Sequence, residues 1–125
     1  MKNLNIPFGK RGEELAAEHL LKNGYKILER NHRSKLGEID IIAEDHGTVC
    51  FVEVKARVGD RSGAPFESIP YFKQQKIART ALLYLTANGL LEKSARFDVV
   101  SVLQNSASGP AQIELLKDAF EMPFR

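Results

Sequence analysis

The pattern of apolar and polar residues predicts two helices. Over 9–23, apolar residues at helical spacing form one stripe, and Gly24 follows the segment as a helix stop. A second helix is predicted over 70–88, with Ile77 on its apolar face and Gly89 just past its end. Each helix is therefore expected to bury one face against a core.

Five strands are also predicted. The two clearest are rich in Ile, Val and Phe, and the turn sequence Asp45-His46-Gly47-Thr48 between them indicates a hairpin. A segment rich in Gly, Ser and charged residues over 58–69 is predicted to be a loop. The strands are expected over 25–30 at a sheet edge, over 37–44 and 49–55 in the hairpin, over 97–103, and more weakly over 112–116 before a turn over 117–120.

The order αβββαββ predicts one domain over 1–125 with an α/β (α+β) fold, in which a mixed central sheet is flanked by helices. Hydrophobic residues make up 43% of the chain and charged residues 27%, which fits a soluble globular protein. No apolar run approaches the roughly 20 residues of a membrane span, and the first residues lack the apolar segment of a signal peptide. A cytoplasmic protein without a membrane partner is expected, with Cys50 as a small core residue.

Charge is distributed unevenly although its net value is only +2. Residues 1–35 carry eight Lys or Arg and four Asp or Glu, whereas residues 36–72 carry three and seven. An acidic centre beside basic segments suits a site that holds cations and approaches a polyanion, and solvated surface charge is the alternative explanation.

Three ionisable residues interrupt the otherwise apolar hairpin strands: Asp40 in the first strand, and Glu53 and Lys55 in the second. Charged groups are rarely buried unless they are paired or bind a metal. The turn favours pairing of Glu44 with Val49. That register would place Asp40 directly opposite Glu53, whereas a slip of one residue would put the two carboxylates on opposite faces.

Opposed carboxylates repel each other unless one is protonated or a cation lies between them. With oxygen ligands alone, the expected cation is Mg²⁺, with Mn²⁺ as a substitute. Lys55 shares a face with Glu53, so it could orient or deprotonate an attacking water or stabilise charge on a phosphate. The alternative is an ordinary Glu53–Lys55 ion pair on a half-exposed face. Convergence with Asp40 is what would favour phosphodiester chemistry.

Glu13 is a fourth candidate. It falls on the apolar stripe of the first helix, three residues before Ala16 and seven before Leu20. A carboxylate on the inward face near the helix N-terminus could reach the metal site, and a favourable contact with the helix dipole is the alternative.

Several basic residues could contact phosphates, and for those other than Arg57 and Lys73 a solvated surface role is the favoured alternative. Arg57 is the best of them because it follows Lys55 by two residues and should face the same side. Lys73 should tilt toward the sheet because it shares a helix face with Ile77. The full set is Arg57, Lys10, Arg11, Arg33, Lys35, Arg61, Lys73 and Lys76.

The chain also resembles a known family. Six runs carry the likeness from about Gly9 to Phe120: GKRGEELAAEHLLKNGYKILERNHR, GEIDIIAED, FVEVKAR, KQQKIARTALLYL, RFDVV and IELLKDAF. They resemble the YraN-type family of small bacterial proteins, which is similar to archaeal Holliday-junction resolvases and to the PD-(D/E)XK nucleases. The resemblance implies a restriction-endonuclease-like three-layer sandwich.

The resemblance also implies roles for individual residues. It implies that Lys55 serves the attacking water. Ile39 stands where the superfamily has a proline, whose value is backbone geometry, so this departure is compatible with metal binding. The Mg²⁺ ligands that it implies are Glu13, Asp40, Glu53 and the carbonyl of Val54.

The leading hypothesis is a Mg²⁺-dependent endonuclease that hydrolyses DNA and prefers branched or single-stranded structure over sequence, because no base-reading motif is present. A second hypothesis is a nucleic-acid-binding module of nuclease fold with little or no turnover, and a third is an adaptor protein. The expected partner is nucleic acid, with DNA favoured, and a homodimer would suit cutting of two strands.

Overall fold

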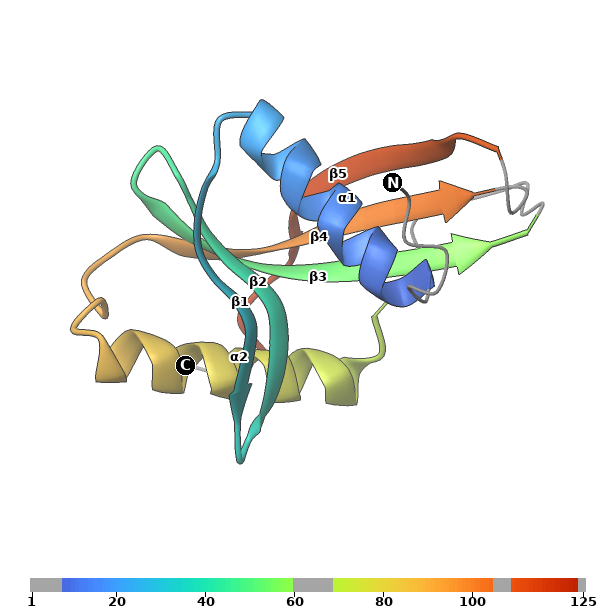
Figure 1. Ribbon diagram of the computed structural model, residues 1–125. Helices are drawn as coiled ribbons and strands as arrows, with labels where there is room; N and C mark the ends of the chain where they lie inside the picture. The colour runs from blue at the N-terminus through green and yellow to red at the C-terminus, as the bar shows by residue number, and fades with distance from the viewer. Residues whose placement is uncertain (1–7, 60–68, 105–108, 124–125) are drawn as a thin grey trace.

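The computed structural model describes residues 8–59, 69–104 and 109–123, and its elements follow the predicted order (Figure 1). Gly24 and Gly89 have φ angles of +88° and +67°, so both glycines end their helices as predicted. The elements are α1 (Phe8–Lys22), β1 (Lys26–Ser34), β2 (Gly37–Asp45), β3 (Thr48–Val58), α2 (Tyr71–Ala87), β4 (Ala95–Gln104) and β5 (Ala111–Phe120).

The strands form one mixed sheet in the order β1-β2-β3-β4-β5. Strands β3 and β4 are parallel and the other neighbours are antiparallel, so α2 is the crossover between the two parallel strands. Helices α1 and α2 cover opposite faces of the sheet (Figure 1). The predicted sandwich of a mixed sheet between helices is confirmed.

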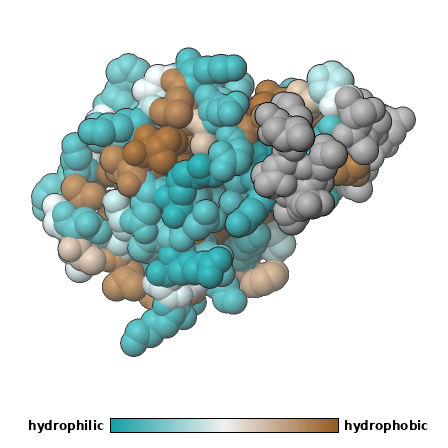
Figure 2. Space-filling model, viewed as in Figure 1, coloured by the Kyte–Doolittle hydropathy of each residue, from teal (hydrophilic) through white to brown (hydrophobic). Residues whose placement is uncertain are grey.

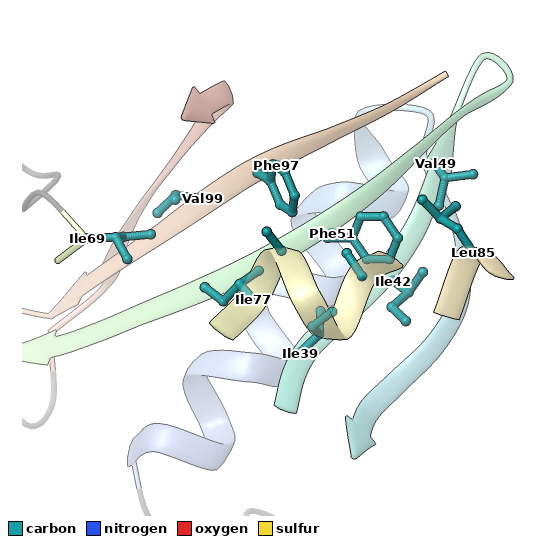
Figure 3. Packing of buried hydrophobic residues seen from close by; sticks show 11 residues of the cluster. Ile39, Ile42, Val49, Phe51, Ile69, Ile77, Leu85, Phe97 and Val99 are labelled. Carbon is teal, nitrogen blue, oxygen red and sulfur yellow. The ribbon is translucent and has the colours of Figure 1, made fainter. Parts of the chain in front are cut away.

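Two hydrophobic clusters hold the layers together. The cluster under α2 contains Phe51, Phe97 and Ile77, and Figure 3 shows side chains from three strands pointing toward that helix. The cluster under α1 contains Leu20 and Val52. Each apolar side chain removed from water contributes about 1.5–3 kcal/mol, so the two clusters fix both helices against the sheet.

The two edge strands are longer than predicted. Strand β1 continues to Ser34 because its polar residues still pair with β2 almost to the turn. Strand β5 continues to Phe120, so the turn predicted over 117–120 is wrong. A register shift between Phe97 and Val99 accommodates Asp118, whose φ is +56°. This bulge breaks the alternation that would have identified the strand in the sequence.

A buried polar network ties β4 to its surroundings. The side chain of Asp98 is fully buried, and it accepts hydrogen bonds from the Tyr25 hydroxyl at 2.8 Å, from Arg96 Nε at 3.0 Å and from the backbone N–H of Asp118 at 2.9 Å. Arg96 in turn donates to Asp45 at 2.6 Å. The network is therefore complete, and it joins the chain after α1 to three strands.

Cys50 is buried as predicted, and burial raises the pKa of its thiol to about 12, which makes it unreactive at neutral pH. Within the described part of the chain, neither helix is long and apolar enough to cross a membrane.

Candidate active site

The candidate site lies where β2 and β3 separate. The ladder between these strands runs from Asp45↔Thr48 through Glu44↔Val49 and ends at Ile41↔Val52. The predicted pairing of Glu44 with Val49 is confirmed. Beyond the ladder, β2 continues with β1 as a hairpin that projects away from the rest of the sheet (Figure 1). Charged residues of four elements, β2, β3, α1 and α2, influence one another electrostatically near this point.

Asp40 is the centre of this group. Its Oδ2 accepts a hydrogen bond of 2.8 Å from the backbone N–H of Val54. Beyond the end of the backbone ladder, a side chain of β2 thus binds a backbone N–H of β3. Burial and the nearby charge of Glu53 raise the pKa of Asp40 to about 7, and Glu13 adds to this shift. The structure thus brings the three predicted carboxylates within electrostatic range of one another.

Glu13 owes its position to a close contact of its helix. The preceding Gly12 is buried, and a Cβ placed on it would lie 2.7 Å from the Cβ of Ala56 in β3. Real Cβ atoms essentially never approach so closely. Because Gly12 has no side chain, α1 can pack closely against β3, and this close packing places Glu13 near the sheet.

We expect Gly12→Ala to destabilise the protein by about 1–2 kcal/mol, because overpacking outweighs the helix preference of alanine. Denaturant unfolding would measure the change. Gly9→Ala is the matched control in the same helix, since nothing lies within 4 Å of a Cβ at Gly9. The control should be neutral or slightly stabilising. Equal effects of the two substitutions would contradict this account of α1.

Lys73 binds the second carboxylate. Its Nζ lies 2.7 Å from Oε2 of Glu53, and the side chains are 43% and 12% exposed respectively. Lys73 belongs to the first turns of α2, so this ion pair joins α2 to β3. Lys73 also lowers the pKa of Asp40, but burial and the charge of Glu53 raise that pKa by more. The sequence predicted that Lys73 tilts toward the sheet, but did not predict its partner.

Lys55 is half-buried on β3, two residues beyond Glu53. Alternation along the strand places both on the side that faces α2, since Val49 and Phe51 belong to the cluster under that helix. The lysine is therefore on the same side of β3 as the carboxylate, as the sequence predicted. The parallel register places it beside Ser101 of β4.

The oxygen atoms of Asp40 and Glu53 suit Mg²⁺, but the residues that the structure describes do not by themselves supply a complete set of ligands. Among residues 8–59, 69–104 and 109–123, no three Asp, Glu, His or Cys side chains stand close enough to hold one ion together. Glu13 therefore acts on Asp40 through space and does not complete a three-carboxylate cage. Mg²⁺ commonly takes one or two carboxylates and fills its shell with waters and substrate phosphates, so Asp40 and Glu53 fit. The backbone N–H of Val54 contacts the site by donating its hydrogen bond to Asp40.

The raised pKa of Asp40 predicts how stability depends on pH. The folded protein holds this proton up to a pH of about 7, whereas the unfolded chain releases it near 3.8. The stability that the protonated form contributes is complete below 3.8 and is lost as the pH rises through 7. Without divalent cations, Asp40→Asn should therefore stabilise the protein at pH 8 by more than about 1 kcal/mol.

The gain from Asp40→Asn should shrink as the pH falls toward and below 3.8, where Asp40 becomes protonated in the unfolded chain as well as in the folded protein. Denaturant unfolding at several pH values, in the presence of a chelator, would measure it. Glu18→Gln on the exposed face of α1 is the control and should change stability little at any pH. A gain that does not vary with pH would contradict the raised pKa.

The predicted phosphate-binding residues lie on α1, on the β1–β2 hairpin, on β3 and on α2. Lys10 is exposed at the start of α1, Lys35 at the turn of the projecting hairpin and Lys76 on α2. Figure 2 shows hydrophilic residues over the middle of this face, between the two helices. Arg57 is half-buried further along β3. Arg61 lies outside the described residues.

Arg11 and Arg33, like Lys73, already have protein partners among the described residues. Arg11 donates a hydrogen bond to Oε1 of Gln104 at the end of β4. Arg33 forms a long, exposed ion pair of 3.9 Å with Glu38 across the hairpin. Such an exposed pair contributes little and is easily exchanged for a phosphate, so Arg33 keeps its predicted role more readily than Arg11.

The Asp98 network is the charged cluster that sequence reasoning did not assemble. Asp98 alternates with Phe97 and Val99 in a buried strand, and Arg96 precedes it by two residues on the same side. That spacing is a weak signal for an ion pair. The contribution of Tyr25 could not be predicted, because 73 residues separate it from Asp98.

Comparison with known proteins gives consistent matches over most of the chain. The family model described as "Uncharacterised protein family UPF0102" matches residues 12–102. A UPF0102 protein of Clostridium kluyveri is 42% identical over 122 residues, which cover 98% of this chain and all of the relative. A UPF0102 protein of Geotalea uraniireducens is 46% identical over 120 residues, which cover 96% of this chain and 94% of the relative.

A distant likeness is found to a solved structure. It is Pyrococcus furiosus SfsA in complex with Ca²⁺, with a TM-score of 0.43 and 18% sequence identity. The match covers 90% of this chain, which spans 63% of the length of that protein.

Proposed function

Because this chain belongs to the uncharacterised protein family UPF0102, as the YraN-type resemblance predicted, we propose a function from the site itself. The proposal is a Mg²⁺-dependent endonuclease that hydrolyses phosphodiester bonds of DNA and prefers branched or single-stranded substrates. Mn²⁺ is expected to replace Mg²⁺.

One observation carries the proposal: Asp40, held at the point where β2 leaves β3, has its pKa raised to about 7 by burial and by the charges of Glu53 and Glu13. A carboxylate in this position is stabilised in its ionised form by a cation. Groups with strongly shifted pKa values gather at functional sites more often than elsewhere. The half-buried Lys55, on the same strand as Glu53, adds the remaining group that phosphodiester hydrolysis needs.

Each residue then has a chemical task. Asp40 and Glu53 would hold the ion, and the N–H of Val54 fixes the Asp40 carboxylate by its hydrogen bond of 2.8 Å. When bound, Mg²⁺ supplies charge stabilisation to the phosphate and lowers the pKa of a water. Lys55 would orient that water or stabilise the developing negative charge. Lys10, Lys35 and Lys76 would bind flanking phosphates and position the strand.

A cleavage assay tests the proposal. Labelled single-stranded, branched and duplex DNA, with an RNA strand for comparison, would be incubated with the protein and Mg²⁺ or Mn²⁺. Cleavage of structured DNA, its loss with a chelator and its loss in Asp40→Asn would support the proposal. No cleavage of any of these substrates with either ion would count against it.

A nucleic-acid-binding module with little turnover is the second candidate, and the ion pair of Glu53 with Lys73 favours it. In that case a lysine already neutralises one carboxylate, and a metal is not required. This candidate predicts salt-sensitive DNA binding that survives Asp40→Asn, together with no cleavage. Fluorescence anisotropy at several salt concentrations would measure the binding.

A further inference from the structure

Lys73 and the expected divalent cation would both bind the carboxylate of Glu53. The ammonium of Lys73 lies 2.7 Å from Oε2 of Glu53, whose side chain is only 12% exposed. The carboxylate of Glu53 also repels Asp40. An ion that binds between these two carboxylates must therefore share Glu53 with a positive charge or displace it.

The position of Lys73 makes displacement feasible. Its side chain is 43% exposed, although its partner is nearly buried. Its backbone is fixed at the start of α2, where its N–H donates to the carbonyl of Pro70 at 2.9 Å. A lysine ammonium is a point charge on a flexible stem with three donors, so the group can move to another anion while the helix stays in place.

The buried Asp45 pair shows a different arrangement. Arg96 contacts Asp45 at 2.6 Å with a side chain that is 20% exposed, and it also binds Asp98 and Tyr25. Those several fixed partners give Arg96 a structural role. The contact of Lys73 with Glu53 is a single ion pair beside a second carboxylate, which is suited to exchange.

We propose that Lys73 couples metal binding to nucleic-acid binding: its ammonium competes with the divalent cation for Glu53 until a substrate phosphate draws it away. The inference rests on the proposed function and names how the same site is regulated. With no substrate, Lys73 keeps the affinity for the ion low. A phosphate near the start of α2 attracts Lys73, frees Glu53 and raises that affinity. By thermodynamic linkage, the ion raises the affinity for nucleic acid by the same factor.

Calorimetric titration with Mn²⁺ tests the coupling. The proteins are the unmodified chain, Lys73→Met, Lys73→Arg and the control Lys93→Met, which changes an exposed lysine beyond α2. Without DNA, Lys73→Met should bind Mn²⁺ about tenfold more tightly, within the usual range of coupling between sites. Lys73→Arg and Lys93→Met should behave like the unmodified chain.

A second series repeats the titrations with a single-stranded oligonucleotide present. Every protein in this series also carries Lys55→Ala, so that the strand stays intact. DNA should tighten Mn²⁺ binding in the parent, and this gain should largely disappear with Lys73→Met.

Three outcomes are decisive. Tighter Mn²⁺ binding by Lys73→Met, together with loss of the DNA-dependent gain, supports the inference. Unchanged or weaker Mn²⁺ binding by Lys73→Met overturns it, while the proposed metal site survives if Asp40→Asn abolishes binding. No Mn²⁺ binding by any of the proteins overturns both the inference and the proposed role of the ion.

Discussion

Lys55→Ala should reduce DNA cleavage by about a hundredfold or more, because removal of one group that stabilises developing charge commonly costs that much. Lys55 is half-buried on β3, and its side chain lies on the same side of the strand as that of Glu53. It removes the charge without taking away the proposed metal ligands. Cleavage rates at saturating Mg²⁺ would be compared with those of the unmodified chain.

Two controls separate this effect from a loss of structure. Lys93→Ala removes an exposed lysine outside the site and should leave the cleavage rate unchanged. Mn²⁺ titration of Lys55→Ala should still detect binding, since Asp40 and Glu53 remain. A cleavage rate within a few fold of the unmodified chain would contradict the role assigned to Lys55.

The largest effect on stability is expected at Asp98. Asp98→Ala should lower the free energy of unfolding by about 3–5 kcal/mol, since breaking a buried ion pair leaves the partner charge uncompensated. The Tyr25 hydroxyl, the Arg96 guanidinium and the backbone N–H of Asp118 would all lose an acceptor. Denaturant unfolding would measure the loss, which is a large part of the stability of a typical domain.

Controls for Asp98 come from the same network and the neighbouring strand. Tyr25→Phe removes two hydrogen bonds, the one that the hydroxyl donates to Asp98 and the one that it accepts from Arg96. It should cost about 1–3 kcal/mol, so it gives a measurable value even if Asp98→Ala does not fold. Glu114→Ala on the exposed side of β5 should change stability by less than about 0.5 kcal/mol. A cost below about 1 kcal/mol for Asp98→Ala would mean that the network contributes little.

The sequence by itself determined the helices, the central strands and the register of the main hairpin. Apolar periodicity marked α1, α2 and the core strands because burial of one face is a local property of the residue order. Pairing of Glu44 with Val49 followed from the short turn between them. The same register brought Asp40 and Glu53 near each other, so the candidate site was visible before the fold.

Only the tertiary structure decided the features that depend on distant contacts. The end of β5 escaped prediction because Asp118 forms a bulge held by Asp98 on β4. Lys73 binds Glu53 across the interface of α2 and β3. A long flexible side chain takes whichever anion the packed elements bring within reach, and residue order does not specify that choice. The end of the β2–β3 ladder and the ion pairs near it therefore depend on how the helices pack against the sheet.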